Sequence, residues 1–184
     1  PKEVMPRAEA AARKALEIDE TLVEAHVALA LVRLSYDWDW TAAQKEFQRA
    51  LQLNPSHAGA YHWYSHYLLV LGRVEESLAA SKRARELDPL NLGITIHMGC
   101  HYLYARQFDE AVEASQKTVE LDPNFWWARY YLGVALEQRG DLARASEQFR
   151  AAGPYTGSRE EATRRMSMLV LAERIEVDRL PELG

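Results

Sequence analysis

Stretches rich in Ala, Leu and Glu alternate along the chain with aromatic-rich stretches, and both kinds have the apolar spacing of amphipathic helices. Short polar breaks separate them. In the first stretch, Ala8, Ala12 and Ala15 form one apolar stripe. The pattern predicts helices at about 6–18, 21–35, 40–53, 56–71, 73–87, 90–105, 107–121, 124–139 and 141–152. No strand is expected, so the sequence predicts an all-α protein.

The breaks that end the Ala-rich stretches recur at a fixed interval. Leu53-Asn54-Pro55, Leu87-Asp88-Pro89 and Leu121-Asp122-Pro123 begin at positions 53, 87 and 121, which is a spacing of 34 residues. A proline removes a helix donor and disfavours the helical conformation of the residue before it. A helix breaker at a constant interval in this range indicates a repeat array.

Other positions repeat at the same interval. Small residues occupy one column at Ser77, Ala111 and Ala145, and Gly72 and Gly140 align where one helix must turn into the next. The first copy is one residue longer than the others, and the extra residue falls between 35 and 40. Loops absorb insertions at small cost, so we expect a longer loop there.

The stretch containing Leu132-Gly133, Ala145, Phe149 and Ala152 resembles the tetratricopeptide repeat (TPR) family. The resemblance covers roughly residues 5–152 and implies a right-handed α-solenoid of helix–turn–helix repeats. Ser81 and Ser115 depart from the family pattern at the position of Phe149. The expected divisions are a partial repeat at 1–20, repeats at 21–55, 56–89, 90–123 and 124–153, and a C-terminal capping helix and tail at 154–184.

The repeat pattern ends at the breaker cluster 153–157. A further amphipathic helix is predicted at about 159–176, with a polar outer face suited to capping the array. The segment 177–184 contains Pro181 and is expected to fray. Because the chain begins at Pro1, we interpret it as a piece of a longer protein.

Composition excludes several classes of function. The net charge of −5 argues against a nucleic-acid-binding surface, and no apolar run is long enough to span a bilayer. The single cysteine, Cys100, rules out an internal disulfide framework. No phosphate-binding glycine loop, nucleophile elbow or carboxylate pair is evident, so we expect neither an enzyme nor a cofactor. We expect a cytoplasmic protein that does not contact membranes.

In the TPR family the first helix of each repeat lines a concave groove, and the resemblance implies the same for this chain. The implied partner-binding residues are His62, His66, Leu69, Ile96, Cys100, Tyr104, Trp127, Tyr130 and Val134. This set is apolar and aromatic and contains two histidines. It favours an apolar or aromatic protein segment as partner, with Trp127, Tyr130 and Tyr104 as anchors. Alternatively, some of these side chains pack within the solenoid, or the C-terminal segment or a second copy covers them.

Some family members clamp the carboxylates of an acidic peptide tail with Lys, Arg and Asn. The matching positions here are Val27, Leu31 and Ile96, so an acidic-tail partner is not expected. A second possibility is a self-association scaffold and possible homo-oligomer. The stretch 36–40, followed by Phe47-Gln48-Arg49-Ala50-Leu51, resembles TPR segments of bacterial regulator and sensor proteins more weakly than the repeat itself resembles the family.

His62 and His66 share one helix face, and Cys100 should lie on the next first helix, so the three are candidate zinc ligands. No carboxylate obviously completes such a set, and structural histidines are the favoured interpretation. His97 and His101 repeat the spacing without the glutamate that zinc proteases require. The two tryptophans at the insertion, Trp38 and Trp40, either fill the gap between two helices or form a second contact surface.

Overall fold

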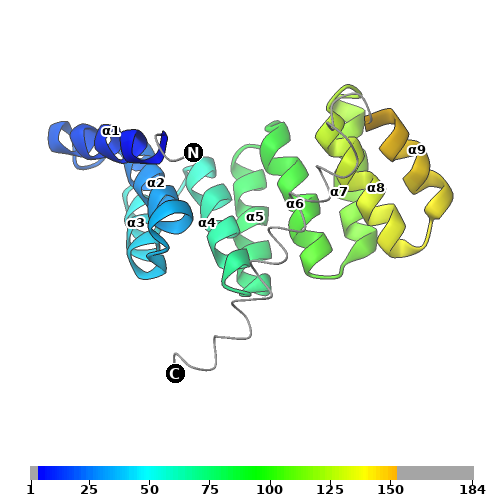
Figure 1. The fold of residues 1–184 in the computed structure, drawn as a ribbon, viewed down its shortest axis with the longest axis horizontal. Helices are drawn as coiled ribbons and strands as arrows, with labels where there is room; N and C mark the ends of the chain where they lie inside the picture. Colours follow the sequence, from blue (N-terminus) through cyan, green and yellow to red (C-terminus); the bar gives the residue numbers. More distant parts are fainter. Residues whose placement is uncertain (1–3, 153–184) are drawn as a thin grey trace. The chain divides into compact units, whose positions relative to one another are not determined.

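The computed structural model describes residues 4–152, and within that range every regular element is a helix (Figure 1). The elements are α1 (Val4–Ile18), α2 (Val23–Val32), a π-helical turn (Arg33–Asp37), α3 (Trp40–Leu53), α4 (Ala58–Val70), α5 (Val74–Leu87), α6 (Leu92–Tyr104), α7 (Phe108–Leu121), α8 (Trp126–Arg139) and α9 (Leu142–Ala152). None of the helices in this described range is long and apolar enough to cross a membrane.

The predicted helices are found with their ends shifted by no more than two residues, except at the end of α2. Agreement is this close where the break is set by local sequence: a Leu-Asn/Asp-Pro triplet ends α3, α5 and α7. The predicted helix at 159–176 and the tail at 177–184 lie outside the described residues.

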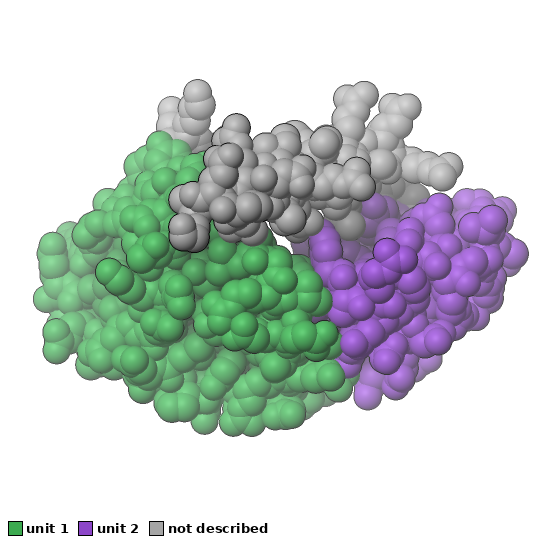
Figure 2. Space-filling view, turned by 90° about the horizontal axis from the view of Figure 1, so that it is seen from below, with its two compact units in different colours: residues 1–94 green, residues 95–184 purple. Residues whose placement is uncertain are grey.

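The chain divides into two compact units, residues 1–94 and 95–184 (Figure 2). In the first unit, α1 packs on α2, α2 packs on α3 and α4, and α4 packs on α5. In the second unit, α7 packs on α8 and α8 packs on α9. Consecutive helices are joined by only a few residues, so the packing partner of each helix is usually its neighbour in the sequence.

Three turns inside the repeats close in the same way. Gly72 (φ 71°), Arg106 (φ 58°) and Gly140 (φ 91°) adopt the left-handed conformation within two residues of the end of a helix. The following amide donates back across the turn, as in Asp141 N–H to the Leu136 carbonyl at 2.9 Å. This geometry satisfies a carbonyl that the helix leaves unpaired at its end. Glycine adopts it without strain, which explains the glycine column predicted from the sequence.

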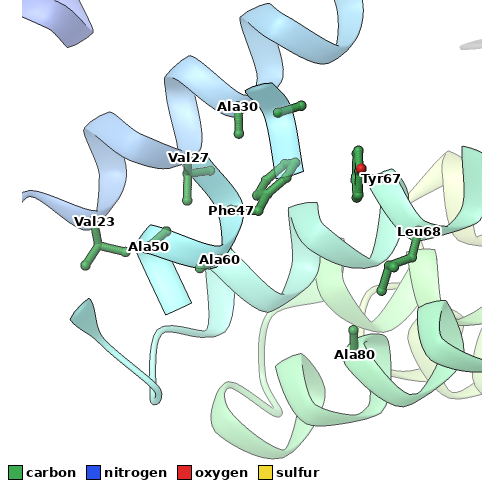
Figure 3. Packing of buried hydrophobic residues seen from close by; sticks show 10 residues of the cluster. Val23, Val27, Ala30, Phe47, Ala50, Ala60, Tyr67, Leu68 and Ala80 are labelled. Atoms are coloured by element: carbon green, nitrogen blue, oxygen red, sulfur yellow. The ribbon is translucent and has the colours of Figure 1, made fainter. Parts of the chain in front are cut away.

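The core of the first unit surrounds Phe47, which is completely buried on α3 (Figure 3). Its ring lies 5.6 Å from the Tyr67 ring and 5.8 Å from the Tyr64 ring, both on α4. The small neighbours Ala30 and Ala60 are fully buried beside it and leave room for the aromatic ring. One phenylalanine therefore joins three helices.

Glycines on two first helices are required by close contacts with the second helix of the same pair. A Cβ atom on Gly133 would lie 2.6 Å from Cε1 of the Phe149 ring, and a Cβ on Gly99 would lie 2.7 Å from the Ser115 hydroxyl. A Cβ atom essentially never lies this close to a nonbonded heavy atom. The departure from the family pattern at Ser115 thus leaves the contact in place, with a smaller side chain against the glycine.

The extra residue of the first repeat is taken up by helix rather than by loop. The prediction of a longer loop was wrong in this respect, because the backbone winds into a π-helical turn at Arg33–Asp37 before α3 begins. A π turn holds one more residue than an α turn. Arg33 pairs with Asp37 across the turn and with Glu9 of α1 at 2.9 Å.

The two tryptophans of this region have different roles. Trp40 packs against the core at the start of α3, and its carbonyl accepts a hydrogen bond from the Tyr67 hydroxyl at 3.1 Å. Trp38 ends the π turn with a left-handed φ of 56° and is 58% exposed. Only Trp40 fills the gap between helices. Trp38 remains on the surface in a backbone conformation that disfavours a bulky residue.

We predict that Gly133→Ala lowers the free energy of unfolding by about 1–3 kcal/mol, because the added methyl group overpacks the Phe149 ring. Urea unfolding followed by circular dichroism measures the change. In a Phe149→Leu background the same substitution should cost less. An equal cost in both backgrounds would show that the glycine is required for another reason.

At position 38 we predict that the glycine variant is more stable than the alanine variant by about 1 kcal/mol. Both substitutions remove the indole, so their difference isolates the cost of a left-handed φ for a residue with a Cβ atom. Thermal unfolding of Trp38→Gly and Trp38→Ala makes the comparison. Equal stability would contradict the left-handed backbone at this residue.

Candidate functional site

The predicted partner-binding residues all lie on first helices of the pairs. In the first unit, α4 carries His62, His66 and Leu69. In the second unit, α6 carries Ile96, Cys100 and Tyr104, and α8 carries Trp127, Tyr130 and Val134. The helical spacing places each set along its helix at intervals of three or four residues, which is the condition for sharing a face.

Burial separates these residues into two groups. Ile96 is fully buried, and Cys100, His62 and Leu69 are nearly so. Trp127 is 39% exposed, and the half-buried members are His66, Tyr104, Tyr130 and Val134. The buried side chains contribute to packing, whereas the partly exposed ones have surface left for a partner.

In the second unit, aromatic rings gather around Trp127. Its indole stacks on Trp126 at 5.6 Å, and the His97 ring of α6 meets it edge-on at 5.4 Å. Tyr130 lies 5.8 Å from Tyr131. We call these five residues the α8 aromatic cluster. Edge-on and offset contacts of this kind add to the stability that burial alone provides, so the rings hold one another in place.

Residues of the neighbouring helices α9 and α6 support the α8 aromatic cluster. Tyr130 contacts the Phe149 ring of α9 at 5.9 Å, and Phe149 in turn fills the space over Gly133. Tyr131 is buried and hydrogen-bonds to Cys100. The partly exposed rings of Trp127 and Tyr130 therefore rest on a packed layer that fixes their orientation.

The cluster is electrically neutral near pH 7. Burial lowers the pKa of His97 to about 4, so its imidazole is uncharged. Burial, with a smaller effect from Glu137, raises the pKa of Tyr130. Burial also raises the pKa of Tyr131 well above its ordinary value, and Cys100 adds to that shift. A surface of this kind favours apolar and aromatic groups over ions.

In the first unit, two histidines and a tryptophan lie together on α4. The rings of His62 and His66 are 4.9 Å apart and perpendicular, and the Trp63 ring lies 5.0 Å from His62 and 5.6 Å from His66. Cys100, the third residue of the predicted metal set, belongs to the second unit. That three-residue set stays a prediction.

Several members of these clusters were absent from the predicted set. Trp63, His97 and Tyr131 form one column of the repeat at intervals of 34 residues. It directly follows the column of His62, Ile96 and Tyr130. Extending the sequence alignment by one more column would have found them. Trp126 carries no such signal in the repeat pattern. Only its stacking on Trp127 identifies it.

Comparison with known proteins gives consistent results. A family model described as tetratricopeptide repeat matches residues 36–91 and 97–158. No curated protein sequence gives a significant match.

Several solved structures are similar to the chain. PilF of Pseudomonas aeruginosa has a TM-score of 0.74 at 21% identity over 97% of this chain and 85% of that one. MamA from Desulfovibrio magneticus RS-1 has a TM-score of 0.68 at 20% identity over 82% and 85%. YrrB, described as a TPR protein with an unusual peptide-binding site, has a TM-score of 0.66 at 22% identity over 89% and 84%. These structures confirm the predicted all-α repeat fold.

We predict that His97 makes the stability of the chain depend on pH. Its pKa is about 4 in the folded chain and about 6.5 when exposed, so the unfolded chain binds the extra proton between these values. The free energy of unfolding should therefore fall as the pH drops from 6.5 to 4, by up to about 3 kcal/mol.

Urea unfolding at pH 7 and at pH 4.5 measures this dependence in the wild type and in His97→Gln. Carboxylates also titrate in this range, so the difference between the two proteins isolates the histidine. The variant should lose less stability than the wild type. Parallel pH profiles, or a His97 ring titration with a midpoint near 6.5 by NMR, would contradict the prediction.

Proposed function

The chain belongs to the tetratricopeptide repeat family, and on that premise we propose that it is a non-enzymatic interaction module that binds an apolar or aromatic protein segment. The observation that carries the proposal is the α8 aromatic cluster, in which Trp127 is exposed while its neighbours are packed. Proteins of this family generally act by binding other proteins. YrrB, which is similar in fold, is described as having a peptide-binding site.

The physical properties of the cluster support a partner of this chemistry. Trp127 and Tyr130 each offer a large apolar surface together with one polar atom, which is the combination that dominates binding energy at protein interfaces. The layer behind them keeps both rings oriented, so less side-chain freedom is lost when a partner binds. A neutral His97 beside Trp127 adds no charge that an apolar partner would have to desolvate.

The arginine near the cluster is already engaged by its own chain. Arg129, on the same helix, donates to the Pro123 carbonyl at 2.8 Å and to the Gln148 side chain at 3.3 Å. Such an arginine is held by its own chain rather than presented to an acidic ligand. The proposed partner is therefore a hydrophobic or aromatic segment, and a terminal carboxylate is not required for its recognition.

Peptide display on the whole chain, selected on the unsubstituted protein alone, tests the proposal. We predict that selected peptides share an apolar or aromatic motif. Their affinity should fall at least about tenfold in Tyr130→Glu and in Trp127→Ala, because each change removes an aromatic anchor. The matched control is Leu121→Glu, which places the same charge on an exposed leucine of α7, and it should bind as the wild type does.

Peptides that bind the two anchor variants as well as the wild type would overturn the proposed surface. If no peptide is selected and sedimentation shows a concentration-dependent mass, the chain is a self-association scaffold instead. Circular dichroism of each variant separates loss of binding from loss of fold.

A further inference from the structure

The histidine pair on α4 has a geometry that the interaction module does not use. His62 and His66 are separated by one helical turn, and each offers a ring nitrogen within 4.8 Å of the other's. Their rings are perpendicular, with centroids 4.9 Å apart. Helical spacing alone requires only a shared face, so the close approach of the two ring nitrogens is information that the structure adds.

The separation of the two rings suits two imidazoles that share one ion. Ring nitrogens bind zinc at about 2.0–2.1 Å, so two nitrogens on a tetrahedral ion lie roughly 3.3 Å apart. From a starting distance within 4.8 Å, small rotations of the two side chains are sufficient to reach this value. The backbone need not move, because both residues lie inside α4 rather than at its ends.

The surroundings of the pair hold it in position. The Trp63 ring contacts both imidazoles, and α4 itself is packed against α2, α3 and α5. His62 is buried and His66 is half-buried. The Trp63 ring therefore restricts the orientation of both imidazoles.

We propose that His62 and His66 bind a divalent transition-metal ion of the zinc, nickel and copper group through one ring nitrogen each. Neutral imidazole prefers these ions over magnesium or calcium, which require oxygen ligands. Two protein ligands leave coordination positions for water or for a donor group from another molecule. The proposal needs neither Cys100 nor the partner segment proposed above, so either proposal can fail without the other.

Titration of the chelator-treated, metal-free chain with Ni²⁺ or Zn²⁺ in a calorimeter tests the site. The expected result is one ion per chain, with affinity that falls on acidification because protons compete for the ring nitrogens. In His62→Gln and His66→Gln the affinity should fall at least about tenfold, since each variant lacks one of the two ligands. An unchanged affinity in either folded variant would overturn the proposal, as would the absence of binding in the wild type.

A matched control comes from another histidine of the same unit. His26 is engaged through both ring nitrogens, with Glu46 at 2.7 Å and with the Glu20 carbonyl at 3.1 Å. His26→Gln removes one histidine from the chain without changing the α4 pair and should leave the affinity unchanged. Loss of the one-to-one binding in this variant alone would place the ion elsewhere.

Cu²⁺ provides a readout in the unsubstituted protein, which matters if a histidine variant does not fold. Because Trp63 contacts both imidazoles, Cu²⁺ should quench its fluorescence, and a chelator should reverse the quenching. Trp63→Phe should retain the ion but lose most of the quenching. In NMR spectra of the wild type, Cu²⁺ should first broaden the ring signals of His62 and His66. Broadening that begins at other histidines would overturn the site.

Discussion

The structure depends on close contact between the two helices of each pair, at a position where the first helix carries a very small residue. Gly133 receives the Phe149 ring and Gly99 receives the Ser115 hydroxyl. In the first unit, Ser77 of α5 donates a 2.8 Å hydrogen bond to the Ser65 carbonyl of α4. Protein interiors are packed so densely that adding a single methyl group at such a contact changes the stability of the fold. The 34-residue period repeats this contact along the chain.

The same contacts decide which side chains remain available at the surface. Phe149 fills the space over Gly133 and at the same time supports Tyr130, so the packing of the pair and the orientation of a surface ring have one cause. Around Trp127, burial keeps His97 neutral and raises the pKa of Tyr131. An uncharged aromatic surface thus results from the packing of the pair and needs no separate explanation.

The first repeat shows how the array tolerates an irregularity. Its additional residue is accommodated in the π-helical turn at Arg33–Asp37, and the helices on both sides keep their packing partners. The strain is concentrated at Trp38, which has a left-handed backbone and an exposed side chain. Trp40, two residues later, is already part of the core. A local change of helix type therefore protects the register on which the rest of the packing depends.

The sequence by itself determined the all-α class, the positions of the helices and the repeat family. Those features follow from local chemistry: the Leu-Asn/Asp-Pro triplets and the turn glycines end helices, and their spacing is visible without a structure. The sequence also identified most of the residues on the first helices, because position within a helix follows from counting. It did not identify the π turn, because counting shows that one residue is extra but not whether a loop or a helical turn holds it.

Only the tertiary structure decided which of those residues are exposed, how the rings are oriented and which groups change their pKa. Ile96 and Trp127 both belong to repeat columns that were predicted to line the binding surface. Ile96 is nevertheless fully buried, whereas Trp127 is exposed. His62 and His66 share a face by counting, but the perpendicular orientation of their rings is seen only in the structure. Burial is set by the helices that pack against a surface, and the periodicity of one helix carries no information about what covers it.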